Sequence, residues 1–354
     1  MTKRYSTRYK TRKRSFTNTL HCLCLVTIIT IGIMTMAFSA PLNRFTVSGT
    51  QIIDPDGNEF IVKGVNAFAS SSEHYDKIVN CWGFNTVLAN HFPDWYWYNP
   101  DYEIDLLVAA YSSNKKVVIL DLAHDALDSD SGIGHYWLPR IKELVNLYSY
   151  YADRYKNNPY VWFQLINEPD TLTFNSEAWI SVHQQLITAI RNTGNQNPIL
   201  VNGWCWGQDA CGWGNYTITE QDSAILGLGD QILNYNGIEQ QNIIFNHHVY
   251  DQFQYNDLSR LTDYHDAIQA KGYALIVGEY GAANINSTLK ATKYMFESTK
   301  PRKIGRIVWS WFGAGSGSDL TIDGEYGSGA GINDCHNPTN LTPLGQMVWD
   351  DNHS

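Results

Sequence analysis

Short, nearly continuous apolar runs alternate along this chain with longer stretches of helical periodicity. Apolar runs of this kind indicate strands buried on both faces, which is typical of a parallel sheet. Eight such runs cover residues 61–66, 84–89, 116–121, 161–167, 199–203, 243–247, 274–278 and 306–310. The best helical stretches cover residues 73–82, 103–112, 138–155, 178–191, 258–270 and 289–298. Eight strands, each followed by a helix or a long loop, predict a single closed (β/α)₈ barrel rather than an open doubly wound sheet.

A short β-hairpin is predicted before the first of these strands. Residues 44–47 and 51–53 flank a turn at Gly49, and Asp54-Pro55-Asp56-Gly57 forms a second turn. The first strand is not followed by a Gly-rich phosphate loop, which argues against a nucleotide-binding fold.

The N-terminus differs in composition from the rest of the chain. Residues 3–14 contain seven Lys and Arg and no acid, and an apolar run follows from about residue 20 to 38. With small residues at Ala37, Ser39 and Ala40, this pattern predicts a signal peptide over residues 1–39. We expect cleavage after Ala37 or Ser39, because Pro41 is poorly accepted after the scissile bond. The alternative is an uncleaved membrane anchor, since the apolar run approaches the length that spans a bilayer. Residues 40–354 would then form one secreted domain.

Charge narrows the classes of partner. The chain has 25 Lys and Arg against 35 Asp and Glu. Seven of those bases precede Leu20, so the mature protein would carry 18 against 35, a net charge of −17. Such an acidic protein is a poor match for nucleic acid or an anionic membrane and suits a neutral substrate. The 12 Trp, 22 Tyr and 13 Phe indicate either a well-packed core or a cleft lined with aromatic rings.

The cysteines do not indicate a metal site. Four of the six lie beyond the signal segment, at Cys81, Cys205, Cys211 and Cys335, with no CxxC pair and no metal-ligand spacing. We therefore expect no metal and no cofactor. In an oxidising compartment Cys205 and Cys211 are close enough in sequence for a disulfide, with free buried thiols as the alternative.

The ends of the predicted strands collect chemically active side chains. Catalytic groups of a (β/α)₈ barrel project from the C-terminal ends of its strands. Those ends carry Asn66, Asn90, His91, His124, Asp125, Asn167, Glu168, Trp204, Trp206, His248, Tyr250, Glu279, Tyr280, Trp309 and Trp311. Two Glu at one barrel mouth suit glycoside hydrolysis, in which one carboxyl group protonates the departing oxygen and the other attacks or activates water. Either Glu alone is equally well explained as a solvated loop residue or an ion-pair partner.

Two motifs carry a resemblance to a known family. Leu165-Ile166-Asn167-Glu168-Pro169 and Val277-Gly278-Glu279-Tyr280-Gly281 resemble the two catalytic signatures of glycoside hydrolase family 5. Gly64-Val65-Asn66, His248-Val249-Tyr250 and Trp309-Ser310-Trp311 have counterparts there, so the resemblance covers nearly all of the mature chain.

A narrower similarity concerns bacterial β-mannanases of that family. It rests on the His124-Asp125 pair, Trp206-Gly207-Gln208-Asp209, residues 309–313 and the closing residues 340–345. Related endoglucanases share the same catalytic core.

The resemblance implies a role for each matching residue. Glu168 would act as general acid and then base, and Glu279 as the nucleophile of a retaining mechanism, with carboxyl groups about 5–5.5 Å apart. Asn167 would bind the 2-hydroxyl beside the cleaved bond, and Tyr250 would hold Glu279 in its ionised state.

Five further residues would shape the substrate site: His124, His248, Trp206, Trp309 and Trp311, with Trp309 forming the floor under the cleaved sugar. Two of them have structural alternatives. His248 is also compatible with a hydrogen-bonded core histidine, and Trp311 with a side chain pointing into the helix layer.

One position departs from the family pattern. The family has an Arg near the end of the second strand, where it hydrogen-bonds the nucleophile, and this chain has Leu88 there. Loss of that cation would weaken the nucleophile as a leaving group in the second step. Asn90 and His91 are candidates to replace the contact.

The favoured function is a secreted endo-acting hydrolase of β-1,4-linked polysaccharide, with mannan ahead of glucan, that acts as a monomer. The alternatives are an endoglucanase or transglycosylase of the same architecture, and a catalytically degenerate carbohydrate-binding barrel.

Overall fold

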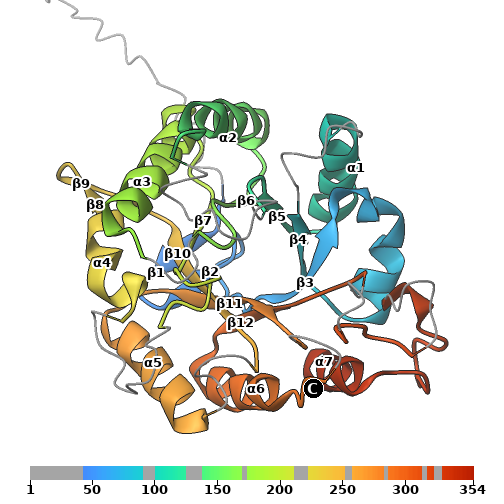
Figure 1. The fold of residues 1–354 in the computed structure, drawn as a ribbon. Coiled ribbons are helices and arrows are strands. Elements are labelled where there is room, and N and C mark those ends of the chain that lie inside the picture. Colours follow the sequence, from blue (N-terminus) through green and yellow to red (C-terminus); the bar gives the residue numbers. More distant parts are fainter. Residues whose placement is uncertain are drawn as a thin grey trace, which may run out of the picture. The chain divides into compact units, whose positions relative to one another are not determined.

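Eight parallel strands close into a barrel in which each strand pairs with its neighbours along the chain (Figure 1). The computed structural model describes residues 43–90, 100–124, 138–169, 174–210, 222–251, 257–282, 286–312, 317–322 and 329–354. The barrel strands are β3 (Lys63–Phe68), β4 (Thr86–Asn90), β5 (Val117–Asp121), β6 (Val161–Gln164), β7 (Ile199–Asn202), β10 (Ile243–Val249), β11 (Leu275–Tyr280) and β12 (Gly305–Val308). The predicted (β/α)₈ fold is confirmed, and so is the N-terminal hairpin, formed by β1 (Thr46–Ser48) and β2 (Gln51–Ile53).

Helices surround the barrel (Figure 1). They are α1 (Pro100–Ser112), α2 (Ile141–Tyr155), α3 (Ser176–Asn192), α4 (Ala224–Leu233), α5 (Leu258–Ala270), α6 (Lys290–Arg302) and α7 (Pro343–Asn352). Short elements complete the described part: η1 (Ala69–His74), η2 (Asp76–Cys81), η4 (Gly329–Gly331) and the small ribbon of β8 (Asn234–Tyr235) and β9 (Ile238–Glu239). Within the described residues, no helix has both the length and the apolar character needed to cross a bilayer.

The helix prediction differs from the structure in three regions, one of which is α7 (Pro343–Asn352), absent from the predicted helical stretches. The stretch 73–82 is a 3₁₀ turn followed by a π-helix rather than one α-helix. Helix α4 was not anticipated, because Gly227 and Gly229 weaken the helical signal of its sequence. Its N-terminus is instead stabilised by Ser223, whose hydroxyl accepts a hydrogen bond from the Leu226 N–H.

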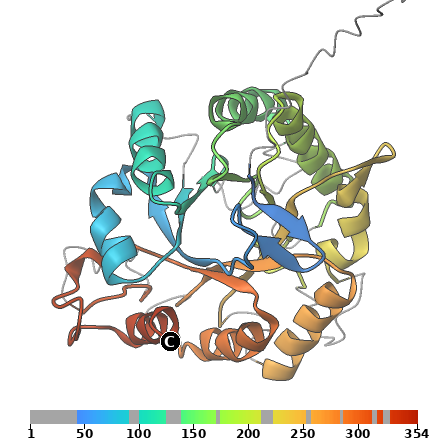
Figure 2. The same cartoon turned by 180° about the vertical axis from the view of Figure 1, so that it is seen from behind.

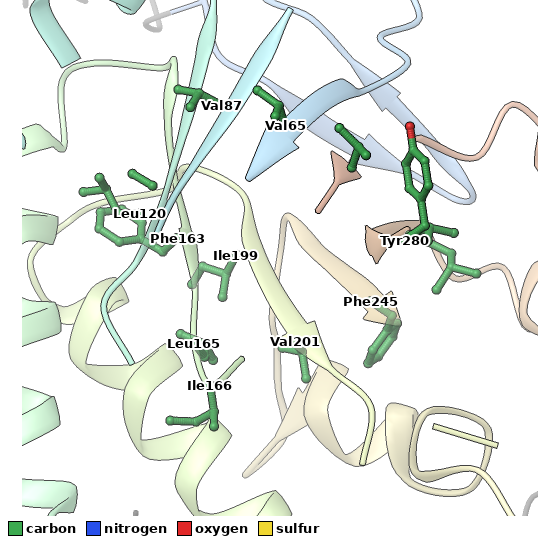
Figure 3. Packing of buried hydrophobic residues seen from close by; sticks show 14 of the residues in the cluster. Val65, Val87, Leu120, Phe163, Leu165, Ile166, Ile199, Val201, Phe245 and Tyr280 are labelled. Atoms are coloured by element: carbon green, nitrogen blue, oxygen red, sulfur yellow. The ribbon is translucent and has the colours of Figure 1, made fainter. Parts of the chain in front are cut away.

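Alternation along the strands divides the core into two layers. Side chains such as Val65, Val87, Leu120 and Phe163 point outward and pack against the helices (Figure 3). Their neighbours along the strands point into the barrel, where apolar residues form a separate cluster: Leu88, Ile119, Trp162, Leu200, Ile244, Ile276 and Ile307. A strand with both faces buried requires the continuous apolar runs seen in the sequence.

The N-terminal end of the barrel is closed by aromatic packing. The hairpin crosses this end, as seen from behind in Figure 2. Phe45 precedes the hairpin and belongs to the interior cluster, and its ring lies 5.0 Å from the Trp162 ring and 5.1 Å from the Phe60 ring, measured between centroids. The opposite, C-terminal end is therefore the one available for a site.

Two disulfides involve described cysteines. Cys81 of η2 pairs with Cys335, across a sequence separation of 254 residues, a pairing the sequence did not indicate. Cys205 is also disulfide-bonded, and its partner lies outside the described residues. The predicted partner, Cys211, is among the residues that the structure does not describe.

Candidate active site

A polar layer lies directly above the apolar interior of the barrel. Alternate residues of a strand point to the same side, so the residue two positions after an inward apolar residue also points into the barrel. In most strands this next inward residue is an amide or a carboxylate. The layer consists of Asn66, Asn90, Asp121, Gln164, Asn202, Asn246, Gly278 and Trp309. Its Asn, Asp and Gln members are all buried. Since an unpaired buried amide costs about 1–3 kcal/mol, such a layer requires an internal hydrogen-bond network.

The hydrogen bonds of this layer converge on Asn167. Gln164 Nε2 donates to Asn167 Oδ1 at 2.9 Å, and Asn202 Nδ2 donates to the Asn167 carbonyl. Asn246 Nδ2 in turn donates to Gln164 Oε1 at 2.9 Å. Gly278 makes room for Asn246, because a Cβ at position 278 would lie 2.2 Å from its amide atoms. The network fixes the backbone and side chain of the residue immediately before Glu168.

Glu168 and Glu279 face each other across this layer. Glu168 follows β6 and its side chain is 21 % exposed, whereas Glu279 lies within β11 and its side chain is 6 % exposed. The pairing of β10 with β11 shifts register between His247 and His248, and the β11–β12 pairing is irregular around Glu279. Irregularities of this kind redirect side chains next to active sites.

His248 lies between the two carboxylates. Its Nδ1 is 3.0 Å from Glu168 Oε1 and 3.6 Å from Glu279 Oε2. Tyr250 donates its hydroxyl hydrogen to Glu279 Oε2 at 2.9 Å. These contacts assign His248 to the site, while its equally buried neighbour His247 points outward to His265 of α5.

One oxygen of each carboxylate and one nitrogen of His248 lie within 4.8 Å of one another. Two carboxylates and an imidazole are also possible ligands for a metal ion. Among the described residues, this is the one group of three or more His, Cys, Asp or Glu side chains close enough to share an ion.

His124 is held flat beside Trp309. Its Nδ1 contacts Asp121 Oδ2 at 2.5 Å and its Nε2 contacts Asn90 Nδ2 at 3.2 Å. Its ring is stacked on the Trp309 ring, with centroids 5.4 Å apart and an angle of 8° between planes. One face of the indole is thus covered by His124. A cavity of about 320 Å³ opens at Trp309, and Phe68 and Phe312 contribute to its lining.

Trp206 lies on a loop of unusual backbone conformation. Cys205, Trp206, Gly207 and Asp209 all have φ between +51° and +70°. This region disfavours L side chains by roughly 1–2 kcal/mol per residue, so tertiary contacts must impose it. Trp206 is partly buried, and Gly207 lies against the His248 ring.

Trp311 requires a correction. It was expected near the substrate, but its side chain is fully buried in the outer layer, where its Nε1–H donates to His74 Nδ1 at 2.9 Å. A Cβ at Gly329 would lie 2.4 Å from the Trp311 ring, so the indole is tightly enclosed. Trp311 has no face available to a sugar. Its side chain points into the helix layer, which was the alternative interpretation.

The structure also shows what surrounds position 88, where the family pattern has an arginine. Leu88 belongs to the apolar interior cluster, one layer below the polar side chains. Asn90, a candidate replacement, contacts His124. His91 and Asp125 lie outside the described residues. Asp121, Gln164, Asn202 and Asn246 were missed by sequence analysis, although each follows an inward apolar residue by two positions, which is the signal that identifies them.

Comparison with known proteins decides the family. Residues 53–315 match the model of the cellulase family, glycosyl hydrolase family 5. The chain belongs to this family. It is therefore a glycoside hydrolase, and double displacement with retention is general to family 5.

Relatives within family 5 include enzymes named for two polysaccharides. The chain is 26 % identical over 334 residues to a mannan endo-1,4-β-mannosidase of Cellvibrio japonicus, a match that covers 91 % of this chain and 73 % of that protein. A mannanase catalytic domain from Streptomyces sp. SirexAA-E superposes with a TM-score of 0.69 at 19 % identity, covering 90 % of this chain and 93 % of that one. An endoglucanase catalytic domain from Thermobifida fusca gives 0.68 at 17 % identity, covering 88 % and 98 %. These two superpositions support the fold and do not separate the two substrates.

Proposed function

We propose that this enzyme is a secreted endo-β-1,4-mannanase in which Glu168 is the acid/base and Glu279 the nucleophile. The observation that carries the proposal is the placement of one oxygen of each carboxylate and one nitrogen of His248 within 4.8 Å of one another. Retaining enzymes have carboxyl groups about 5–5.5 Å apart, whereas inverting enzymes need about 6.5–9.5 Å to admit a water molecule. The spacing supports direct attack by one carboxylate.

The two carboxyl groups differ in surroundings as the reaction requires. Glu279 is more buried and accepts the Tyr250 hydroxyl, which stabilises a carboxylate in a fixed orientation. Glu168 is more exposed, which suits a residue that exchanges protons with the leaving group and water. Repulsion between negative charges this close favours a state in which only one is ionised.

The reaction proceeds in two displacements. Glu279 attacks the anomeric carbon while Glu168 gives its proton to the departing glycosidic oxygen, which leaves an ester bond between sugar and Glu279. Glu168 then removes a proton from water, the water attacks the same carbon, and the bond to Glu279 breaks. Two inversions give net retention.

The remaining site residues orient the sugar. Asn167, held by the amide network, binds the 2-hydroxyl next to the cleaved bond, and Trp309 supplies an apolar floor whose other face rests on His124. Trp206 is a further aromatic contact. His248 and Tyr250 hydrogen-bond the carboxylates, which offsets the absence of an arginine at position 88.

We propose mannan rather than glucan as the substrate because sequence relatives are named as mannanases. Mannan endo-1,4-β-mannosidase is the name of the Cellvibrio japonicus protein, matched over most of its length. An endoglucanase is the second candidate, favoured by the similar superposition on the Thermobifida fusca enzyme.

Export is part of the proposal. Residues 1–39 act as a signal peptide, and residues 40–354 form the mature catalytic domain, which acts as a monomer. The disulfides at Cys81–Cys335 and Cys205 support an oxidising compartment. N-terminal sequencing of the exported protein should begin at Phe38 or Ala40, and a mature protein that retains Met1 would contradict this.

The substrate is tested by the release of reducing sugar from mannan, glucomannan and carboxymethylcellulose, with Glu279→Ala as the inactive control. We expect release from the two mannose-containing polymers. Release from carboxymethylcellulose alone would identify an endoglucanase, and no release from any polymer would overturn the hydrolase roles. Proton NMR of the first product distinguishes retention from inversion.

A further inference from the structure

Asp209 is a buried carboxylate that the proposed reaction does not use. It is fully buried, yet it accepts hydrogen bonds from the Tyr264 hydroxyl at 2.8 Å, the Ser223 hydroxyl and the Ala224 N–H at 2.9 Å. Burial raises its pKa to about 6, although these hydrogen bonds oppose the rise. Burying a carboxylate costs free energy, so the contacts of Asp209 are expected to have a structural or functional role.

The contacts of Asp209 tie the loop after β7 to two helices. Ser223 and Ala224 form the N-terminus of α4, where backbone N–H groups and the helix dipole favour a negative charge. Tyr264 belongs to α5. Gly203 allows the close approach of the carboxylate, because a Cβ there would lie 2.3 Å from Asp209 Cβ. Asp209 therefore anchors a loop whose backbone, with four left-handed residues, would not adopt this shape unaided.

The anchored loop ends at His248. The Gly207 carbonyl accepts the His248 N–H at 2.8 Å, and a Cβ at Gly207 would lie 2.6 Å from His248 Nδ1. Gly207 thus packs directly against the imidazole of His248. It does so at Nδ1, the nitrogen that lies 3.0 Å from Glu168 Oε1. A continuous series of contacts joins Asp209 to the acid/base through the loop and His248.

We infer that Asp209 is a positioning residue for Glu168: it holds the loop that sets His248 at hydrogen-bond distance from the acid/base. The inference rests on the role proposed for Glu168. Glu279 lies farther from His248 Nδ1, at 3.6 Å, and has its own contact from Tyr250, so loss of Asp209 affects acid catalysis more than nucleophilic attack.

The test compares two leaving groups on the same oligosaccharide. Cleavage of a natural glycosidic bond needs a proton from Glu168, whereas a 2,4-dinitrophenyl group departs without one. For each substrate kcat/KM is measured, because it reports the steps up to the glycosyl-enzyme ester. In Asp209→Ala we expect kcat/KM for the natural bond to fall about 10- to 100-fold, as for a misplaced catalytic group. For the dinitrophenyl substrate we expect a loss of less than about 3-fold.

Two further variants keep the test decisive if Asp209→Ala does not fold. Asp209→Asn preserves the size of the side chain and an acceptor for the Ala224 N–H, and should give a smaller split of the same kind. Gly207→Ala perturbs the other end of the contact series and should reproduce the split. Equal losses on both substrates in the folded variants, or no loss on either, would overturn the inference.

Two controls separate the possible failures. Asp351→Asn removes a buried carboxylate that pairs with Arg306 near the start of β12, away from the site. It should lower the melting temperature without any split between leaving groups. Glu168→Gln must itself show the split. If it does not, the proposed role of Glu168 fails, and if it does while the Asp209 and Gly207 variants do not, only the inference about Asp209 fails.

Discussion

Tyr250 donates a hydrogen bond to Glu279 Oε2 at 2.9 Å, and Tyr250 is the residue immediately after β10. This phenol is a stabilising contact of Glu279, the proposed nucleophile. Removing a hydrogen bond to a charged group costs roughly 1.5–3 kcal/mol. Tyr250→Phe should therefore lower kcat/KM about 10- to 100-fold, measured on soluble mannan and on an aryl glycoside.

The matched control for Tyr250→Phe is Tyr273→Phe. Tyr273 also donates to a carboxylate, Asp230 Oδ1 at 2.7 Å, but at α4 on the outside of the barrel. Its loss should leave kcat/KM within about 2-fold. Similar kinetics for the two variants would show that Tyr250 does not support Glu279 in the proposed reaction.

Trp309 and Trp311 are two residues apart, and their substitution should have opposite consequences. Trp309 lines the cavity at the barrel mouth, so Trp309→Ala should lower kcat/KM by at least about 10-fold with a small change in stability. Trp311 is enclosed by Gly329 and bonded to His74, so Trp311→Phe should lower the free energy of unfolding by about 1–3 kcal/mol with little change in KM. Urea denaturation and steady-state kinetics of both variants provide the measurement, and a raised KM in Trp311→Phe would refute the assignment.

Buried histidines should make the enzyme sensitive to acid. Burial lowers the pKa of His183 to about 4 and of His265 to about 3, and the pKa of His247 falls well below its usual value for the same reason. These groups are neutral in the folded state but bind protons near pH 6.5 once unfolded. Their contribution to stability is therefore complete above pH 6.5 and is lost as the pH falls from 6.5 toward about 3, by up to roughly 1.4 kcal/mol per pH unit for each group. Burial raises the pKa of Asp209, Glu103 and Asp319, which acts in the opposite sense. The pKa values of four other aspartates are lowered by hydrogen bonds, and their contribution to stability is also lost as the pH falls below about 4: Asp105, Asp257, Asp266 and Asp334.

Melting temperatures between pH 7 and pH 4 test this expectation. The His183 Nδ1–H donates a hydrogen bond to the Trp179 carbonyl at 2.7 Å, so His183→Gln keeps a polar contact while removing the titration. The decline in melting temperature with falling pH should be shallower in His183→Gln than in the parent enzyme. An identical slope would exclude His183 as a cause.

The Cys81–Cys335 disulfide should contribute stability but not activity. It closes a loop with a sequence separation of 254 residues, and cross-links of long loops contribute about 2–5 kcal/mol, largely by restricting the unfolded chain. The double substitution of both cysteines with serine should lower the midpoint of guanidinium denaturation while kcat at 25 °C stays within about 2-fold. A loss of activity in the folded variant would place this disulfide in the function of the site.

The sequence by itself determined the barrel and the positions of its two glutamates. Eight apolar runs separated by helical stretches leave few architectures, since a strand buried on both faces must lie in a covered parallel sheet. Asn167-Glu168-Pro169 and the segment around Glu279 then fall at the mouth by register alone. Local signals also sufficed for the hairpin at Gly49, because turn chemistry acts between near neighbours.

Only the tertiary structure decided which side chains meet. His248 bridges two glutamates that are 111 residues apart in sequence, and no periodicity specifies that distance. Trp311 and Trp309 have the same residue type and lie on one strand end, yet packing against Gly329 assigns Trp311 to the outer layer. Asp209 and the amide network of Gln164, Asn202 and Asn246 satisfy polar groups inside the barrel through partners on other strands and helices. Their roles depend on three-dimensional proximity, which is set when the barrel closes and not by any local stretch of chain.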